Sequence, residues 1–235
     1  RRIIAELPEM IYYKTEEGVA VNLYAESSAE LEIRPGIPLT IRQETDYPNS
    51  GEVGICLEPA QATEFSLKLR IPRWCRQAEI SINGRDSIRE VAGGTFVTLH
   101  RQWQSGDRVR LAMPMEWRVV KGRKSQAGRV AVMRGPQLFC LNPDRQENFP
   151  PDFMRRMAID PASLQLGEPD SSIRPQGLTC RAKFWNPNNY WPSAPADMQL
   201  TLTEYADPGC QQTYFLLINP QVDMLVEDEL CERMP

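Results

Sequence analysis

The sequence predicts an all-β protein, with two antiparallel β-sandwich domains that follow the end of a helix. Three observations lead to this fold class. Short segments with alternating apolar residues recur at spacings of roughly 8–15 residues through most of the chain, as in antiparallel sandwiches. Turn signals such as Asn83-Gly84 and Ser105-Gly106-Asp107 separate these segments. Only the first residues show the apolar spacing of a helix.

Residues 1–17 are expected to form the end of a helical domain. The apolar residues at helical spacing make one stripe: Ile3, Ile4, Leu7, Met10 and Ile11. No capping residue precedes the stripe, so the helix begins as if it were already under way. Leaving such side chains in water forfeits about 1.5–3 kcal/mol each, and we therefore expect the stripe to pack against a neighbour.

Residues 18–122 are expected to form the first sandwich. The clearest strand covers residues 65–71, where Phe, Leu, Leu and Ile alternate with polar residues before Pro72. Further strands are predicted at residues 19–23, 31–33, 39–41, 53–57, 80–82, 96–99 and 109–113. The polar segment 121–126 is the expected linker to the next domain.

Residues 123–221 are expected to form the second, less regular sandwich. Its strands are predicted at residues 129–132, 138–141, 178–184, 198–203 and 213–218. The proline-rich stretch 142–175 is long for a loop in a compact domain, so it is expected to hold short strands or to wrap over a neighbour. The acidic tail 222–235 is expected to be a frayed helix or disordered.

The composition is that of an ordinary globular protein. Of the 235 residues, 41% are hydrophobic and 25% are charged, close to the averages of soluble domains, which argues against disorder. The formal net charge is −4 and the basic residues are scattered, so nucleic acid is not an expected partner. No apolar run of the sequence approaches the ~18 residues of a membrane helix, so a membrane is not an expected partner either.

The cysteines are widely spaced, without a C-x-x-C pair or a nearby histidine. They are Cys56, Cys75, Cys140, Cys180, Cys210 and Cys231. This is not the spacing of metal ligands, so no metal-binding residue and no cofactor are predicted in this chain. A chain of this size does not need a disulfide scaffold. We therefore expect reduced cysteines, with disulfides as the alternative.

Isolated polar residues give little support for catalysis. Glu44, Asp46 and Glu52 flank a turn and could perform acid–base chemistry on a glycosidic bond, but turn formation and solvated strand ends explain them better. His100, the only histidine, has no Ser or Cys partner that the sequence identifies, so a catalytic triad is not predicted. Trp74 is expected to close one end of the first sandwich, with a sugar platform as the alternative.

The segment 184–192 is the best candidate for a binding site. It reads Phe-Trp-Asn-Pro-Asn-Asn-Tyr-Trp-Pro and interleaves aromatic rings with amides on a predicted loop. Rings stack on sugars and amides hydrogen-bond their hydroxyls, so Trp185, Tyr190 and Trp191 are the predicted substrate-binding residues. The alternative is an interface loop that docks on a neighbouring domain, because aromatic patches also mark such surfaces.

An ordered set of motifs resembles the C-terminal β-sandwich region of glycoside hydrolase family 127, the β-L-arabinofuranosidase family, and its sister families. The motifs are VNLY at 21–24, QETDYP at 43–48 with Gly51, LRIPRWC at 69–75, ING at 82–84, RQW at 101–103 with Gly106-Asp107, and RVAVMRGP at 129–136. The resemblance covers residues 1 to about 141 well and is thinner beyond them.

The resemblance implies an (α/α)6 barrel before the sandwiches, with the active site in that barrel. There, a cysteine thiolate acts as nucleophile in a retaining double displacement, beside a zinc site of Cys and Glu ligands. The nucleophile belongs to a Cys-Cys pair that precedes the helix which residues 1–13 resemble. None of the six cysteines in this chain belongs to that motif, so neither a catalytic residue nor a zinc ligand is carried over.

Two hypotheses about function follow. In the first, the chain is the non-catalytic sandwich part of a retaining glycoside hydrolase, inactive alone, which braces the barrel or its dimer. In the second, it is a free-standing carbohydrate-binding module. The expected partners are the helical barrel domain, carbohydrate and a second copy of the chain. The apolar stripe at the N-terminus favours the first hypothesis, because it needs a domain to pack against.

Overall fold

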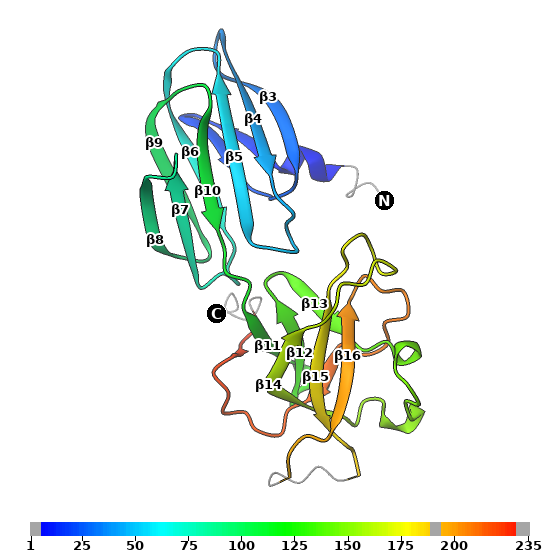
Figure 1. Ribbon diagram of the computed structural model, residues 1–235. Helices are drawn as coiled ribbons and strands as arrows, with labels where there is room; N and C mark the ends of the chain where they lie inside the picture. The colour runs from blue at the N-terminus through cyan, green and yellow to red at the C-terminus, as the bar shows by residue number, and fades with distance from the viewer. Residues whose placement is uncertain (1–5, 189–193, 229–235) are drawn as a thin grey trace. The chain divides into compact units, whose positions relative to one another are not determined.

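A computed structural model describes residues 6–188 and 194–228 and confirms the all-β prediction. The chain divides into two compact units, Arg1–Met115 and Glu116–Pro235 (Figure 1). Within the described residues, no helix is long and apolar enough to cross a membrane. The helical elements are short 3-10 turns: η1 (Leu7–Met10), η2 (Lys124–Gln126), η3 (Pro143–Arg145) and η4 (Pro151–Phe153).

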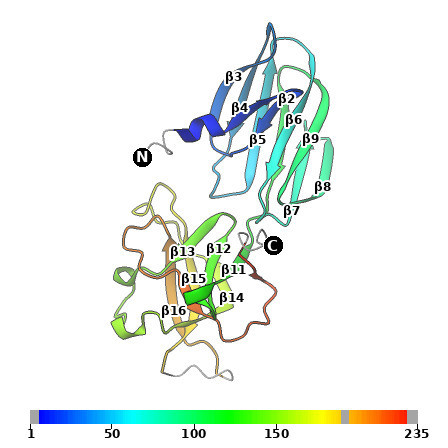
Figure 2. The same cartoon turned by 180° about the vertical axis from the view of Figure 1, so that it is seen from behind.

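The first unit contains two sheets. The four-stranded sheet has the order β1 (Tyr12–Thr15), β2 (Gly18–Val21), β6 (Thr63–Ile71), β9 (Thr95–Trp103). The six-stranded sheet has the order β3 (Ser27–Arg34), β4 (Ile37–Glu44), β5 (Glu52–Pro59), β10 (Asp107–Ala112), β7 (Gln77–Ile82), β8 (Asp86–Ala92). All neighbours are antiparallel except β2 and β6, which run parallel side by side (Figure 2).

The two sheets enclose one hydrophobic core. Strand β6 alternates as the sequence predicts, with Phe65 and Leu67 fully buried, and Ile55 and Val109 face them from the other sheet. Trp103 at the end of β9 is also fully buried and donates its indole N–H to the carbonyl of Phe65 at 3.0 Å. The alternating apolar residues thus fix which side of each strand faces the core.

The N-terminal helix prediction is wrong for the described part of the segment. Leu7–Met10 form only the single 3-10 turn η1, and Tyr12 and Tyr13 already belong to β1, where they pair with Val21 and Ala20 of β2. Aromatic residues favour strands, and a neighbouring strand was available to pair with. Residues 12–15 therefore belong to the first unit and not to a separate helical segment ending at residue 17.

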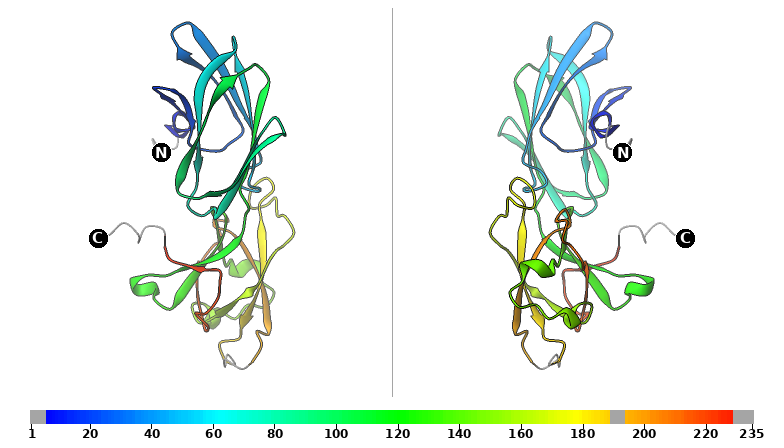
Figure 3. Two further views of the ribbon diagram at one scale, coloured as in Figure 1. Left: turned by 90° about the vertical axis from the view of Figure 1, so that its left-hand side faces the viewer. Right: turned by 90° about the vertical axis from the view of Figure 1, so that its right-hand side faces the viewer.

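The apolar stripe of that segment is only partly packed. Leu7 is 43% exposed, whereas Met10 and Ile11 are half-buried. Ile3 and Ile4 lie outside the described residues. Figure 3 shows the dark blue segment of η1, β1 and β2 at one side of the first unit.

The second unit is built on one sheet and not on the second sandwich that the sequence predicts. The strand order is β13 (Gln137–Cys140), β16 (Met198–Glu204), β15 (Thr179–Trp185), β14 (Ala158–Leu166), β17 (Tyr214–Leu216), β12 (Arg129–Arg134), β11 (Trp117–Lys121), β18 (Leu225–Val226). An additional pairing of β13 with β12 closes the run from β13 to β12 into a barrel-like ring.

The closed ring explains why the alternation of apolar residues predicted a sandwich here. Inward and outward residues alternate along a barrel strand in the same way as along a sandwich strand. In Figure 3, the yellow and orange strands β15 and β16 lie apart from the green strands β11 and β12. The large buried side chains Phe139, Phe184 and Phe215 fill the space that these strands enclose.

Two of the predicted domain boundaries differ from those in the structure. Residues 117–121 form β11, which pairs with β12, so they belong to the second unit and not to a first domain ending at residue 122. Leu225 and Val226, expected in a frayed tail, form β18 and pair in parallel with Val119 and Val120. Residues 229–235 lie outside the described part.

The cysteines also depart from expectation. Cys140 and Cys210 are joined by a disulfide, with their Cα atoms 5.8 Å apart. They are 70 residues apart in sequence, so only the barrel topology brings them together. Cys56, Cys75 and Cys180 are buried and lie outside this disulfide, as suits small apolar side chains.

Candidate functional site

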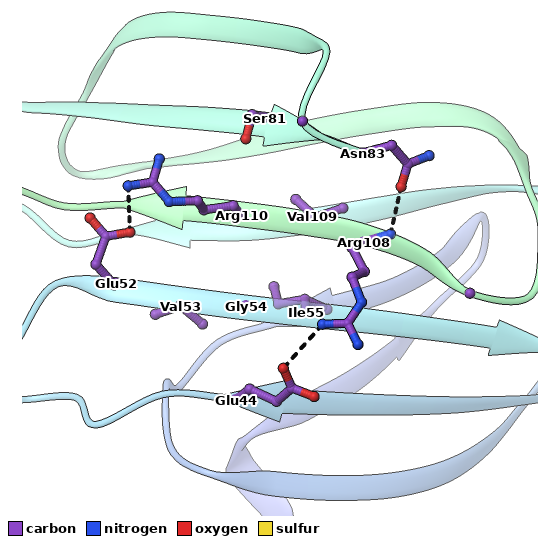
Figure 4. Close-up of a pocket in the computed structure, with 12 residues that line it drawn as sticks. Glu44, Glu52, Val53, Gly54, Ile55, Ser81, Asn83, Arg108, Val109 and Arg110 are labelled. Carbon is purple, nitrogen blue, oxygen red and sulfur yellow. Dashed lines mark hydrogen bonds and ion pairs between the residues drawn. The ribbon is translucent and has the colours of Figure 1, made fainter.

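A depression lies on the outer face of the six-stranded sheet, the face turned away from the core (Figure 4). Its volume is about 570 Å³, and β4, β5, β7 and β10 contribute its lining. Alternation along the strands produces it: Val53 and Ile55 of β5 are buried in the core, so Glu52 and Gly54 face outward. In the same way Arg108 and Arg110 of β10 face outward beside them.

Gly54 forms the hollow itself. In the strand register it lies between Glu44 of β4 and Arg110 of β10. A side chain at this position would occupy the space between these two, and glycine leaves it open. We refer to this feature as the Gly54 depression.

Two ion pairs border the Gly54 depression. Arg108 Nη1 lies 3.2 Å from Glu44 Oε2, and Arg110 Nη2 lies 2.8 Å from Glu52 Oε2. All four side chains are about half exposed, with exposed fractions between 52% and 66%. Each carboxylate therefore faces a fixed positive charge and water, an arrangement that suits hydrogen bonding to a polar ligand.

The three carboxylates considered for acid–base chemistry lie in different surroundings. The structure brings Glu44 and Glu52 to one depression, each beside its own arginine. Asp46 instead accepts a hydrogen bond from the Ser50 hydroxyl within the turn, as a turn former does. Glu44 and Glu52 are therefore each engaged in an ion pair across strands, and Asp46 in the turn.

A tight turn forms the rim of the Gly54 depression. Asn83 and Gly84 have φ of 51° and 70°, the left-handed pair that a two-residue hairpin turn requires. The Asn83 amide donates to Asp107 Oδ1 at 2.9 Å, and its Oδ1 accepts the backbone N–H of Arg108 at 2.8 Å. These bonds fix the backbone from which the Arg108 side chain extends.

His100 has partners that the sequence did not identify. Its Nδ1 lies 3.0 Å from Ser66 Oγ and its Nε2 lies 3.3 Å from Glu64 Oε1. The register of β6 and β9 places Ser66 directly opposite His100. The sequence does not identify this partner, because the two residues are brought together only by strand pairing.

This Ser–His–Glu contact does not provide a usable nucleophile. Ser66 is 1% exposed, and its backbone N–H is bonded to the carbonyl of Glu17 at 2.8 Å. A hydroxyl on so buried a residue is not accessible to a carbonyl substrate, so the contact is a polar link between β6 and β9.

Buried ion pairs tie the proline-rich stretch to the second unit. Arg145 Nε lies 2.7 Å from Asp207 Oδ2, and Arg174 Nε lies 2.6 Å from Glu204 Oε2. Burial raises the pKa of Asp207, but hydrogen bonds from Asn142, the Gly209 N–H and Thr203, together with the charge of Arg145, outweigh it and lower the pKa. The stretch thus wraps over its own unit, held by pairs that no sequence pattern indicated.

The predicted aromatic site is only partly described. Trp185 ends β15, is half-buried, and donates its indole N–H to the carbonyl of Ala194 at 2.6 Å. This bond fixes the ring within its own loop. Tyr190 and Trp191 lie outside the described residues, so contact of the three with carbohydrate stays a prediction.

The described residues do not fit the zinc site implied by the resemblance. Across residues 6–188 and 194–228, no three His, Cys, Asp or Glu side chains come together as a metal-ligand set. Burial raises the pKa of the Cys180 thiol to about 12, which keeps it protonated and a poor ligand.

Comparison with known proteins identifies the first unit. Residues 18–115 match the family model described as the middle domain of GH127 β-L-arabinofuranosidase. Residues 18–115 thus form a GH127-like domain. This confirms the resemblance that the sequence motifs indicated.

Longer relatives extend the likeness beyond the GH127-like domain. The chain is 32% identical over 148 residues to the non-reducing end β-L-arabinofuranosidase of Bifidobacterium longum subsp. longum, covering 59% of this chain and 22% of the relative. A solved GH127 β-L-arabinofuranosidase from Geobacillus stearothermophilus T6 is 28% identical with a TM-score of 0.73, covering 97% of this chain and 36% of the other.

A second solved structure, a glycoside hydrolase, gives a similar result. It is 25% identical with a TM-score of 0.77, covering 93% of this chain and 39% of the other. The chain therefore spans 22% of the curated relative and 36% and 39% of the two solved chains. Both β units have counterparts in these larger proteins.

Proposed function

We propose that this chain is the non-catalytic β part of a retaining glycoside hydrolase related to the β-L-arabinofuranosidases, and that it braces a separate catalytic domain. One observation carries the proposal: the fold of nearly the whole chain, 97%, is matched within a solved GH127 enzyme of which it covers 36%. The remainder of such an enzyme has room for the helical catalytic barrel.

The chemistry of the described residues supports this division of labour. Glu44 and Glu52 lie beside arginines, and Ser66 is buried. A retaining glycosidase needs an accessible nucleophile and a general acid. The proposal assigns both to the catalytic domain, together with zinc.

Assays of the purified chain test the catalytic half of the proposal. We expect no hydrolysis of an aryl β-L-arabinofuranoside, with or without added Zn²⁺, above the rate in buffer. Variants with Ser in place of Cys56, Cys75 and Cys180 in turn serve as controls. Zinc-dependent turnover that disappears in one of these variants would show that the chain carries its own active site and would refute the proposal.

A second experiment tests the bracing role. The coding region upstream of codon 1 is sequenced, and the encoded segment is co-expressed with this chain. We expect an in-frame helical domain that co-elutes with the chain in size-exclusion chromatography and is more active with it than alone. Unchanged activity of the helical domain in the absence of the chain would contradict the bracing role.

A second candidate function is carbohydrate binding, which the Gly54 depression favours. Its guanidinium and carboxylate groups can donate to and accept from neighbouring sugar hydroxyls at once. The test is an NMR titration of the ¹⁵N-labelled chain with arabinose oligosaccharides, repeated with Gly54→Gln, which fills the hollow. Shifts at β5 and β10 that vanish in the variant would support binding, and their absence in the wild type would exclude it.

A further inference from the structure

A second depression, in the unit Glu116–Pro235, has a different chemical character. Its volume is about 460 Å³. It is lined by Ser125, Gln126, Arg129, Arg155, Gln211, Gln212, Thr213 and Tyr214. These residues come from η2, the start of β12, the segment after η4 and the segment leading into β17. We call it the Arg155 depression.

The charge of the Arg155 depression is not balanced by its lining. Its two charged residues, Arg129 and Arg155, are both cationic. Within the described part of the chain, neither forms an ion pair with a carboxylate, whereas the adjacent Arg156 pairs with Asp152 at 3.8 Å. In the Gly54 depression, by contrast, both arginines have a glutamate partner. A site with two uncompensated guanidinium groups favours an anion.

The backbone of Arg155 is held in an unfavourable conformation. Its φ is 64°, in the left-handed region that residues with a side chain rarely adopt. Arg129 Nη2 donates to the Arg155 carbonyl at 2.7 Å, and the Arg155 N–H donates to Gln212 Oε1 at 2.8 Å. Such strain persists where the surroundings enforce it, and it concentrates at functional sites.

Gln212 is the fixed part of this arrangement. It is 5% exposed, and its Nε2 donates to the carbonyl of Tyr214 at 2.9 Å while its Oε1 holds Arg155. Both ends of the amide are therefore engaged. The Arg155 backbone, and with it the origin of its exposed side chain, is preorganised for a ligand.

We propose that the Arg155 depression binds the carboxylate of an acidic sugar residue. A guanidinium presents a planar fork that matches a carboxylate, and the two arginines supply the charge. The other lining side chains are neutral amides and hydroxyls, among them Gln126, Gln211 and Thr213, which suit sugar hydroxyls, and Tyr214 adds an aromatic ring. The volume is sufficient for a small ligand.

This proposal is independent of the proposed function. It concerns the second unit, outside the GH127-like domain of residues 18–115. An enzyme part, a binding module or an unrelated β protein could each carry such a site, so failure of one proposal leaves the other standing.

The test is titration of the full ¹⁵N-labelled chain with D-glucuronate and D-galacturonate, followed by NMR. We expect saturable shifts at the amides of Arg155, Gln212 and Tyr214. D-Xylose, which lacks the carboxylate, and sulfate, which lacks the sugar, are expected to bind at least about tenfold more weakly, since a lost charged hydrogen bond costs about this factor. Equal binding of xylose would refute the anion site, and equal binding of sulfate would refute the sugar.

Variants connect the binding to the two arginines. Arg155→Gln and Arg129→Lys are expected to weaken uronate binding at least about tenfold, the first by removing a charge and the second by replacing the fork with a point charge. Arg156→Gln changes the neighbouring arginine, which has its own carboxylate partner, and is expected to bind normally. Unchanged wild-type spectra at high uronate concentration, or normal binding by Arg155→Gln, would overturn the proposal.

Discussion

Replacing Gly54 with alanine should stabilise the first unit. An ideal Cβ at Gly54 would lie 3.5 Å from Glu44 O and 3.8 Å from Glu44 Cβ, which is ordinary van der Waals contact. The added methyl group therefore meets no clash. Alanine restricts the unfolded chain more than glycine does, so we expect a gain of about 0.4–1 kcal/mol in the free energy of unfolding.

Gly51 provides the matched control. A Cβ there would lie 1.7 Å from Met113 O, a distance at which the backbone must move, so Gly51→Ala should cost about 1–3 kcal/mol. Calorimetry of the wild type and both variants should place the transition of the first unit about 2–6 °C higher for Gly54→Ala. The transition of Gly51→Ala should lie below that of the wild type. Destabilisation by Gly54→Ala comparable to that by Gly51→Ala would refute this account of the depression.

Three further outcomes are expected in the second unit. Arg145→Met leaves the buried Asp207 without its cation and should lower the free energy of unfolding, measured in urea, by about 3 kcal/mol. This is the low end for buried pairs, because the Arg145 side chain is 27% exposed. A loss smaller than that of an exposed ion pair would contradict this. Because the pKa of Asp207 is lowered in the fold, the stability that this group confers is present above the pKa of an unfolded aspartate and is lost as pH falls through the folded pKa. Asp207→Asn should therefore weaken the dependence of the free energy of unfolding on pH in the acid range. The Cys180 thiol, with its pKa raised to about 12, should resist alkylation at pH 8 until the chain unfolds, and mass spectrometry of the native protein checks this.

The sequence predicted those parts of the fold that depend on local pattern. The alternation in β6 follows from four apolar residues spaced two apart, and the turn follows from the adjacent residues Asn83 and Gly84. The structure confirms both. The all-β class follows because this pattern recurs along the chain. The motif set indicated the GH127-like domain of residues 18–115 for the same reason, since motifs are short and ordered.

Features that depend on distant residues could not be predicted in this way. The contact of Ser66 with His100, the disulfide of Cys140 with Cys210 and the closure of β13 on β12 each join segments that only the completed topology brings together. The helix prediction for residues 1–17 is wrong over its described part for a related reason. Strand β2 offered hydrogen-bond partners to Tyr12 and Tyr13, and tertiary pairing outweighed the local apolar spacing.

The Gly54 depression also depends on residues that are distant in the sequence. The sequence places Glu44, Asp46 and Glu52 around one turn. The arginine partners of Glu44 and Glu52, which are Arg108 and Arg110, come from a strand more than fifty residues further along the chain. Each of the two glutamates is one half of an ion pair between strands. Charge balance at a β-sheet surface is decided across strands, which a linear pattern does not show.

The order of strands in the first unit also determines when it can fold on the ribosome. Strand β2 lies in parallel beside β6, whose first residue is Thr63, and β10 inserts between β5 and β7 of the other sheet. The strands of the four-stranded sheet follow the order of synthesis, whereas the six-stranded sheet cannot be completed until its fourth strand, β10, has been made. Until residues 107–112 have left the exit tunnel, β5 and β7 keep unpaired edges that invite pairing with other chains. Slow translation before Asp107 would prolong this vulnerable interval, and a chaperone acting on nascent chains would be most useful there.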